Sequence, residues 1–262
     1  MLSDILREPS LKTIDITTSD RITAHRKILE AKPIMRSVCR ETYALCADLD
    51  LRLFTGVGRR IELGAGASFM KDFFPDVSIT DLLPAPHLDE VMDAQAMTNV
   101  TDGSVRAFFG IHCFHHLPEP RKFFAELMRT LSPGGGCVLV EPYFGLFARQ
   151  LFPRLFPTEG FDMTQAAWET PRAATGDYAN QALSYNVFFR DRSIFESEFP
   201  QLEIVHADQL TSYPRYLLSG GLNFRSLVPR SSTPILKGLE QVLSPLRSVL
   251  AVHHVIVLRK RP

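Results

Sequence analysis

Short apolar runs alternate with longer amphipathic stretches between about residues 58 and 145. The runs that end at Leu63, Asp81, His112 and Glu141 are four to eight residues long and are bounded by Gly, Pro or charged residues, which is typical of buried strands. Arg121–Leu131 instead has the spacing of an amphipathic helix. Strands that alternate with helices predict a doubly wound, mostly parallel α/β sheet.

The two ends of the chain add different elements. Ser19 and Asp20 can cap a helix, and Ile34, Val38, Leu45 and Leu49 fall near one helical stripe, so we expect an N-terminal helical region over 1–54. The main domain then spans 55–262. Within it, 142–200 and 211–248 are too long for simple connections and predict inserted caps. Strands are expected at 202–206 and 252–258, and short helices at 69–74 and 191–199.

The most informative motif is a glycine turn after the first strand. Glu62-Leu63-Gly64-Ala65-Gly66 places two glycines directly after an apolar run, with an acid two residues before the first. Glycine lets backbone turn tightly and approach a ligand, and in parallel α/β sheets this turn lies beside a nucleotide-like cofactor. A dinucleotide site needs a third glycine where this chain has Phe69. The motif therefore favours a cofactor without a pyrophosphate.

Later motifs appear in a fixed order along the chain. An acid ends the second strand, another follows a short apolar stretch, a histidine-rich turn follows the fourth strand, and a glycine-rich turn precedes the fifth. The segments are Asp81, Asp93-Ala94, Phe114-His115-His116-Leu117-Pro118-Glu119-Pro120 and Leu131-Ser132-Pro133-Gly134-Gly135-Gly136. With the glycine turn, they resemble the class I S-adenosylmethionine (SAM)-dependent methyltransferases, in particular the methyltransferase type 11 group. The resemblance covers roughly 55–145.

The resemblance implies a Rossmann-like sheet of seven strands with an antiparallel last strand, and SAM as the cofactor. Glu62 would organise the methionine end, Asp81 would bind the ribose, and Asp93 the adenine amino group. Serine stands at position 68, where many members have a third glycine. The full set of expected cofactor residues is Glu62, Gly64, Ala65, Gly66, Asp81, Leu82, Asp93, Ala94 and His112.

Catalytic residues are expected where the fourth and fifth strands end. His115 or His116 could take a proton from an acceptor, and Glu141 lies at the same edge of the sheet. A structural or cofactor-contact role for the histidines is the alternative. No metal site is expected, because three nearby histidines rarely converge on an ion without a further carboxylate. The aromatic residues expected to line the acceptor pocket are Tyr143, Trp168, Tyr178 and Tyr185.

Composition narrows the class of partner. Lys+Arg and Asp+Glu both number 29, so nothing favours nucleic-acid binding. The four cysteines form no CxxC pair, and the first residues lack the layout of a signal peptide. No apolar run approaches the roughly 20 residues of a membrane helix. We therefore expect a cytoplasmic protein, monomer or homodimer, with peripheral membrane contact at 213–228 as an alternative to core packing.

The predicted function is methyl transfer from SAM to a nucleophile of a small or amphipathic acceptor, with lipid-linked compounds and secondary metabolites included. Oxygen is the favoured nucleophile, and nitrogen or carbon remain open. Two alternatives stay open as well. The chain could bind SAM without catalysis and act as a partner protein, or it could be an NAD(P)-dependent oxidoreductase, against which Phe69 argues.

Overall fold

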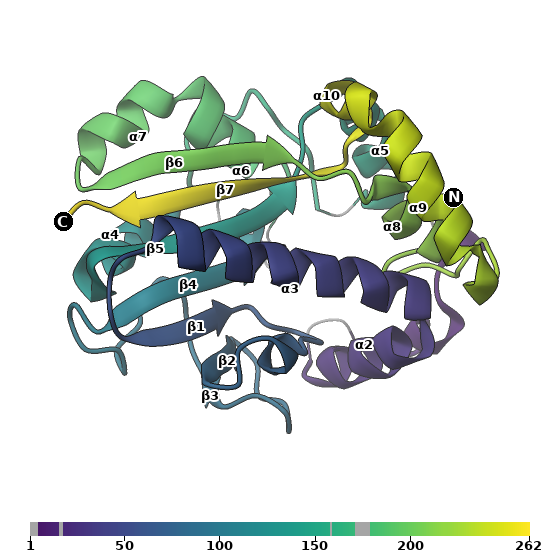
Figure 1. The fold of residues 1–262 in the computed structure, drawn as a ribbon, viewed down its shortest axis with the longest axis horizontal. Coiled ribbons are helices and arrows are strands. Elements are labelled where there is room, and N and C mark those ends of the chain that lie inside the picture. Colours follow the sequence, from purple (N-terminus) through teal and green to yellow (C-terminus); the bar gives the residue numbers. More distant parts are fainter. Residues whose placement is uncertain (1–4, 16–17, 158, 171–178) are drawn as a thin grey trace.

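The computed structural model describes residues 5–15, 18–157, 159–170 and 179–262. Its centre is one seven-stranded sheet with the order β3-β2-β1-β4-β5-β7-β6 (Figure 1). Only β7 runs against its neighbours, β5 and β6. The predicted doubly wound α/β sheet with an antiparallel last strand is therefore confirmed. The strands are β1 Arg59–Leu63, β2 Val77–Asp81, β3 Glu90–Val91, β4 Val105–Ile111, β5 Leu131–Pro142, β6 Leu202–Gln209 and β7 His253–Lys260.

Helices cover both faces of the sheet. Alternate side chains of each strand point to opposite faces, so Phe108 and Phe109 join two different cores. The longest helix, α3 Pro33–Leu53, packs Tyr43, Cys46 and Leu49 on one face. On the other face, α4 Pro120–Thr130 and α7 Arg192–Glu198 pack against Phe108. Both layers exclude water from the strands, so the strands read as nearly continuous apolar runs.

The prediction of a helix at 69–74 is wrong. The structure has only a 3₁₀ turn, η2 Met70–Asp72, between the glycine turn and β2. Pro75 follows closely, and the sheet face that a helix would cover is already occupied by α3, whose Tyr43 packs edge-on to Phe69 with ring centroids 5.0 Å apart. The amino-terminal helix therefore takes the place of the usual first crossover helix.

Several of the remaining helices gather beyond the carboxyl ends of the parallel strands, at the right of Figure 1. There α2 Asp20–Ala31, α8 Tyr213–Ser219 and α9 Thr233–Leu243 stand beside the start of α3. These helices thus stand beside the edge at which the parallel strands end. The other helical elements are η1 Pro9–Leu11, η3 Phe114–His116, α5 Leu146–Leu155, α6 Leu183–Tyr185, η4 Asn186–Arg190, η5 Arg230–Ser232, η6 Ser244–Leu246 and α10 Arg247–Leu250.

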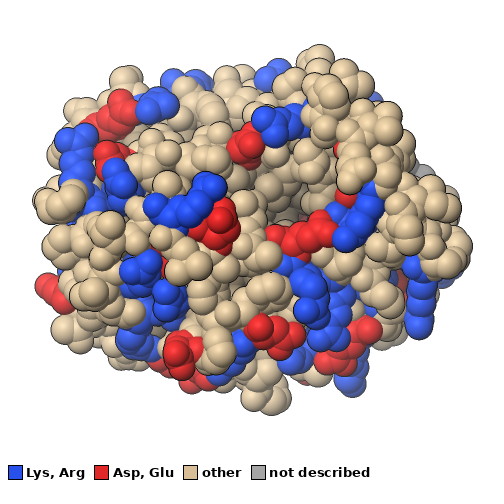
Figure 2. All heavy atoms as spheres, in the orientation of Figure 1, with Lys and Arg blue, Asp and Glu red and all other residues tan. Residues whose placement is uncertain are grey.

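Charged residues of both signs are interspersed over the face in Figure 2, in keeping with the equal numbers of acidic and basic residues. The same face is hollowed between α3 and the carboxyl-terminal helices (Figure 2). Among the helices that the structure describes, none has the length and apolar composition needed to span a bilayer.

Candidate active site at the carboxyl edge of the sheet

The glycine turn after β1 has the backbone that only glycine adopts easily. Gly64 and Gly66 have φ angles of +59° and +51°. A Cβ on Gly64 would lie 2.7 Å from Sγ of Cys113, so this glycine is needed for close packing on the turn after β4. A Cβ on Gly66 would meet only the Gly64 carbonyl oxygen, at 4.0 Å. The outer side of the turn at Gly66 is therefore open to a ligand.

Glu62 is buried beneath this turn. Its side chain accepts a hydrogen bond of 2.5 Å from Oγ of Ser68, and 2% of the residue is exposed. Burial raises the pKa of the Glu62 carboxyl to about 8, the Ser68 hydrogen bond opposes this rise, and the Asp81 charge adds to it. With this pKa, the buried Glu62 carboxyl is readily protonated near pH 7, and a cationic group beside it would stabilise its ionised form. Ser68, noted in the sequence only as a departure from glycine, is thus the partner of the acid.

The two strand-end acids organise the loops that follow them. Oδ2 of Asp81 accepts a hydrogen bond of 2.9 Å from the Gly66 N–H, and Oδ1 accepts one of 3.2 Å from the Leu83 N–H. Oδ1 of Asp93 accepts the Gln95 N–H at 2.8 Å. Because β2 and β3 are neighbouring parallel strands, both acids lie at the carboxyl edge of the sheet. Leu82 is 58% exposed beside them, while Ala94 is buried.

Glu141 and His115 form the most constrained pair of the site. The Glu141 carboxylate is fully buried and accepts the backbone N–H groups of Cys113, Phe114 and His115 at 3.1, 2.9 and 3.3 Å. Its Oε2 also lies 2.5 Å from Nδ1 of His115. A carboxylate can only accept, so when Glu141 is ionised the ring proton is on Nδ1 and Nε2 presents a lone pair. Burial raises the pKa of Glu141 to about 7, and the charges of His112 and His116 oppose the rise.

His112 occupies a strained position. It is the one non-glycine residue with positive φ (+55°) among those described, a conformation that is uncommon outside glycine and often marks a functional site. Its ring contacts His253 edge-on, with centroids 4.4 Å apart, and lies 6.3 Å from Tyr216. These three line a cavity of about 50 Å³ with residues of α3. Burial lowers the pKa of His112 to about 4, so the imidazole is neutral at pH 7.

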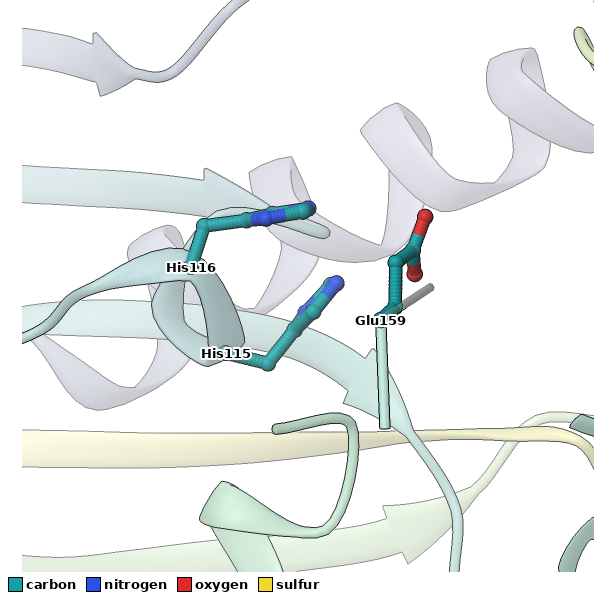
Figure 3. Close-up of side chains that lie close together, drawn as sticks. All are labelled: His115, His116 and Glu159. Atoms are coloured by element: carbon teal, nitrogen blue, oxygen red, sulfur yellow. The ribbon is translucent and has the colours of Figure 1, made fainter. Parts of the chain in front are cut away.

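A third side chain joins the histidine turn from the cap after β5. Nitrogen or oxygen atoms of His115, His116 and Glu159 all lie within 4.8 Å of one another. Figure 3 shows the two rings and the carboxylate converging. Nothing in the sequence singles out Glu159, because it lies in an irregular segment with no motif around it. Its contribution to the site depends entirely on how the cap folds back.

The aromatic residues predicted to line an acceptor pocket lie in different environments in the structure. Trp168 is 1% exposed, sits in the core against Phe124 and donates from Nε1 to Asp191 at 2.9 Å, so it is a core residue and that prediction is wrong. Tyr143 is buried at the end of β5, and Tyr185 is partly exposed; both contact Phe144, with centroids 4.5 and 4.7 Å apart. Tyr178 lies outside the described residues.

The start of the 213–228 segment is packed against its neighbouring helices. Arg215 of α8 is 2% exposed and pairs with Glu240 of α9 and Glu41 of α3, so its guanidinium has no access to lipid phosphate. Exposed apolar side chains lie near the end of this segment, at Leu227 (56% exposed), and on α9 and the turn after it, at Ile235, Val242 and Leu246, which are 75%, 75% and 52% exposed. Exposed apolar side chains are therefore found both in 213–228 and on the next helix.

Comparison with known proteins gives one family match and a set of similar solved structures. A family model described as a methyltransferase domain matches residues 80–139. No curated protein sequence matches the chain. Many solved structures do match. A geranyl diphosphate C-methyltransferase from Streptomyces coelicolor A3(2) is 16% identical, with 84% of this chain and 78% of that chain covered and a TM-score of 0.47.

A SAM-dependent methyltransferase from Archaeoglobus fulgidus is 12% identical, with 85% of this chain and 94% of that chain covered and a TM-score of 0.49. At these identities and scores, neither structure says what this chain binds. The match over 80–139 starts at the end of β2 and continues into β5, so it includes Asp81, Asp93, His112 and the His115–His116 turn.

Proposed function

Because the chain carries a methyltransferase domain and the sheet of the class I SAM-dependent methyltransferases, we propose that it transfers a methyl group from SAM to a small or amphipathic acceptor. One observation carries the proposal. The strand order puts β1 beside β4, and a Cβ on Gly64 would lie 2.7 Å from Sγ of Cys113, so the glycine turn borders the turn after β4 that carries the Glu141-held histidine. A cofactor site and a group that can activate an acceptor therefore share one edge of the sheet.

The residues present fit SAM. Gly66 leaves its outer side free, which is where a ligand can approach the backbone. The Asp81 carboxylate, held by two backbone N–H groups, keeps lone pairs for the ribose hydroxyls, and exposed Leu82 offers an apolar surface beside the adenine. Buried Glu62 would face the cationic amino end of the cofactor. Bound there, SAM supplies an electrophilic methyl group.

The amino-terminal helical region contacts the glycine turn, which supports a role for it as a cover over the cofactor. Arg26 of α2 donates from Nη1 to the Ser68 carbonyl oxygen at 2.7 Å, so α2 is attached directly to the glycine turn. Tyr43 of α3 donates to Oγ of the same serine at 3.1 Å. We assign residues 1–54 to a cover over the cofactor, and 55–262 to the methyltransferase domain proper.

The acceptor's nucleophile is assigned to the space in front of His115. Glu141 fixes the ring through Nδ1, and Nε2 is then directed toward His116 and Glu159 (Figure 3). A base that is oriented by a carboxylate is the usual arrangement for removing a proton from a weak nucleophile. Oxygen nucleophiles need this help most, since a hydroxyl is a poor nucleophile until its proton is removed. We therefore favour oxygen, with nitrogen and carbon as alternatives.

The acceptor is assigned an apolar part. The cavity beside His112 is lined largely by apolar and aromatic side chains, but at about 50 Å³ it is far smaller than the roughly 300 Å³ or more of ordinary ligand pockets. An acceptor must therefore displace part of the cap. The exposed apolar side chains of α9 lie near α8, which covers this cavity, and they suit an amphipathic acceptor or contact with a membrane surface.

The test begins with calorimetric titration of the full chain with SAM, S-adenosylhomocysteine and NADH. Binding of the first two alone is expected. Binding of NADH alone would favour the oxidoreductase alternative, and binding of none would overturn the cofactor assignment. An acceptor screen read by mass spectrometry follows, with hydroxylated amphipathic compounds included. The non-catalytic alternative would be supported if SAM bound tightly and no acceptor of any class gained a methyl group.

A further inference from the structure

The turn after β4 and the cap after β5 together present two imidazoles and one carboxylate to a common point. His115 and His116 come from η3, and Glu159 comes from the segment after α5. We propose that these three residues bind a divalent first-row transition-metal ion, for which Zn²⁺ is the natural probe. The sequence predicted no metal because the histidines lacked a nearby carboxylate; the fold supplies one 43 positions beyond His116 along the chain, at Glu159.

His115 makes the same kind of supporting contact that metal-binding histidines make. A ligating histidine usually donates its other ring N–H to a carboxylate, which fixes the ring and makes the free nitrogen a better ligand. Glu141 Oε2, 2.5 Å from Nδ1, occupies this position. Glu141 is itself held by three backbone N–H groups of the same turn. Glu141 therefore fixes the orientation of the His115 ring through Nδ1.

The carboxylate of Glu159 is also held in place. Nε2 of Gln181 donates to Oε2 of Glu159, and the Gln181 backbone N–H donates to the Gly160 carbonyl at 3.2 Å. The neighbouring Asn180 N–H donates to the His115 carbonyl at 3.1 Å. The cap is thus fastened both to the carboxylate and to the histidine turn. Oε1 of Gln181 is buried and accepts no hydrogen bond within the described part of the chain.

The donor set selects the class of ion. Two imidazole nitrogens and one carboxylate oxygen suit Zn²⁺, Fe²⁺ or Co²⁺, whereas Mg²⁺ and Ca²⁺ prefer oxygen ligands alone. Catalytic zinc sites commonly have three protein ligands and keep a further position open. The open position here would take an oxygen of the acceptor. An ion that holds this oxygen lowers its proton affinity and does the work assigned above to the lone pair of His115.

The geometry requires a modest contraction. Nitrogen and oxygen ligands about 2.0–2.1 Å from a tetrahedral ion stand roughly 3.3 Å apart, and the donor atoms here are separated by up to 4.8 Å. The two rings are already close, with centroids 4.2 Å apart and planes at 39°. Small side-chain rotations of His116 and Glu159 can close the remaining distance, since both are only partly buried.

The test measures metal binding directly, on the full chain freed of ions with a chelator. Titrations with Zn²⁺ by calorimetry and with Co²⁺ by visible absorption report affinity and coordination without any acceptor. His116→Ala and Glu159→Gln remove one ligand each and should weaken binding at least about tenfold. His206→Ala on β6 and Glu196→Gln on α7 remove the same side-chain types far from the cluster and should bind like the unaltered chain.

Each outcome decides the matter. One Zn²⁺ per chain, weakened in both ligand variants and unchanged in both controls, supports the site. No binding, or binding that the ligand variants leave unchanged, overturns it and leaves His115 as the proton acceptor. The inference rests on the proposed function only for the role of the open position. Titration of the same samples with S-adenosylhomocysteine distinguishes failure of the metal site from failure of the proposed function, because cofactor binding should not depend on the ion.

Discussion

Oδ2 of Asp81 accepts a hydrogen bond of 2.9 Å from the backbone N–H of Gly66. The acid that ends β2 therefore fixes the turn that follows β1, and the two motifs act as one unit. The carboxylate keeps further lone pairs, and an added Cβ on Gly66 would meet only the Gly64 carbonyl oxygen, at 4.0 Å. Substitutions in this unit can separate damage to the fold from damage to the cofactor site.

The first prediction concerns Gly66→Ala, with Gly103→Ala as its matched control. Gly66 and Gly103 have φ angles of +51° and +61°, and an added Cβ has no protein atom closer than 4.0 Å at either position. Both changes should lower the free energy of unfolding by about 1–2 kcal/mol through backbone strain. Only Gly66→Ala should also lose affinity for S-adenosylhomocysteine, at least about tenfold, or 1.4 kcal/mol.

Denaturant unfolding and calorimetry on the same samples check this. Equal cofactor affinity in the two variants would place the cofactor away from Gly66. Gly64 is a poorer choice for the test, because a Cβ there would collide with Sγ of Cys113 and disturb the fold directly.

The second prediction concerns the pH dependence that Glu62 imposes. Its folded pKa of about 8 is above the usual carboxyl value near 4.5, so the folded state holds a proton that the unfolded state releases between these values. The contribution of Glu62 to stability is therefore largest at low pH and is lost as pH rises from about 5 to 8. Glu62→Gln, which cannot ionise, should become more stable relative to the unaltered chain over this window.

The check is the difference in free energy of unfolding between the two proteins, measured at intervals from pH 5 to pH 9. Taking the difference cancels the buried histidines, which titrate in both proteins. A difference that does not vary with pH would mean that Glu62 is not protonated in the folded state.

The third prediction concerns Trp168, the only tryptophan of the chain. Its Nε1 donates to Asp191, and the Arg121 guanidinium lies 4.2 Å from the centre of its ring. Trp168→Phe should cost about 1–3 kcal/mol of stability, from the cavity and the lost hydrogen bond. Affinity for S-adenosylhomocysteine and the choice of acceptor should not change. Tyr185→Phe, at a partly exposed ring, should stay within about 0.5 kcal/mol.

Circular dichroism follows unfolding in this series, because the substitution removes the tryptophan fluorescence. An altered acceptor preference in Trp168→Phe at full stability would mean that Trp168 lines the acceptor pocket after all.

The fourth prediction concerns the buried pair of Arg215 and Glu240, which joins α8 to α9. Oxygens of Glu240 lie 2.9 and 2.8 Å from Nε of Arg215, and both residues are nearly inaccessible to water. Arg215→Leu should cost about 3–5 kcal/mol, because it leaves the Glu240 charge buried without a partner. Changing Glu240 to Leu as well should recover most of this loss. Thermal and denaturant unfolding of the two variants measure it, and a double variant no more stable than Arg215→Leu would contradict the account.

Local patterns were enough to predict much of this protein. The short apolar runs fixed the strands of the sheet, because a strand buried on both faces needs apolar side chains at nearly every position. The glycine turn was predictable from Gly64 and Gly66, since their backbone conformation depends on the residues themselves. The strand-end acids followed from the rule that the carboxyl ends of parallel strands meet at one edge.

Contacts between distant segments could not be predicted in this way. The fate of 69–74 was decided by α3, which already covered the sheet face that a helix there would need. Trp168 lies in an irregular segment, so no periodicity says which way its ring points. Arg215 lost its access to solvent only because α3 and α9 supply carboxylates to it.

The sequence by itself determined the strands of the sheet, the glycine turn and the acids at the strand ends, because each depends on residues close together in the chain. Only the tertiary structure decided that Glu141 holds His115 and that Glu159 joins the histidine pair. These partners are 26 and 43 or more positions apart, and their meeting depends on strand order and on how the cap packs. Neither the strand order nor this packing can be predicted from a local pattern of side chains.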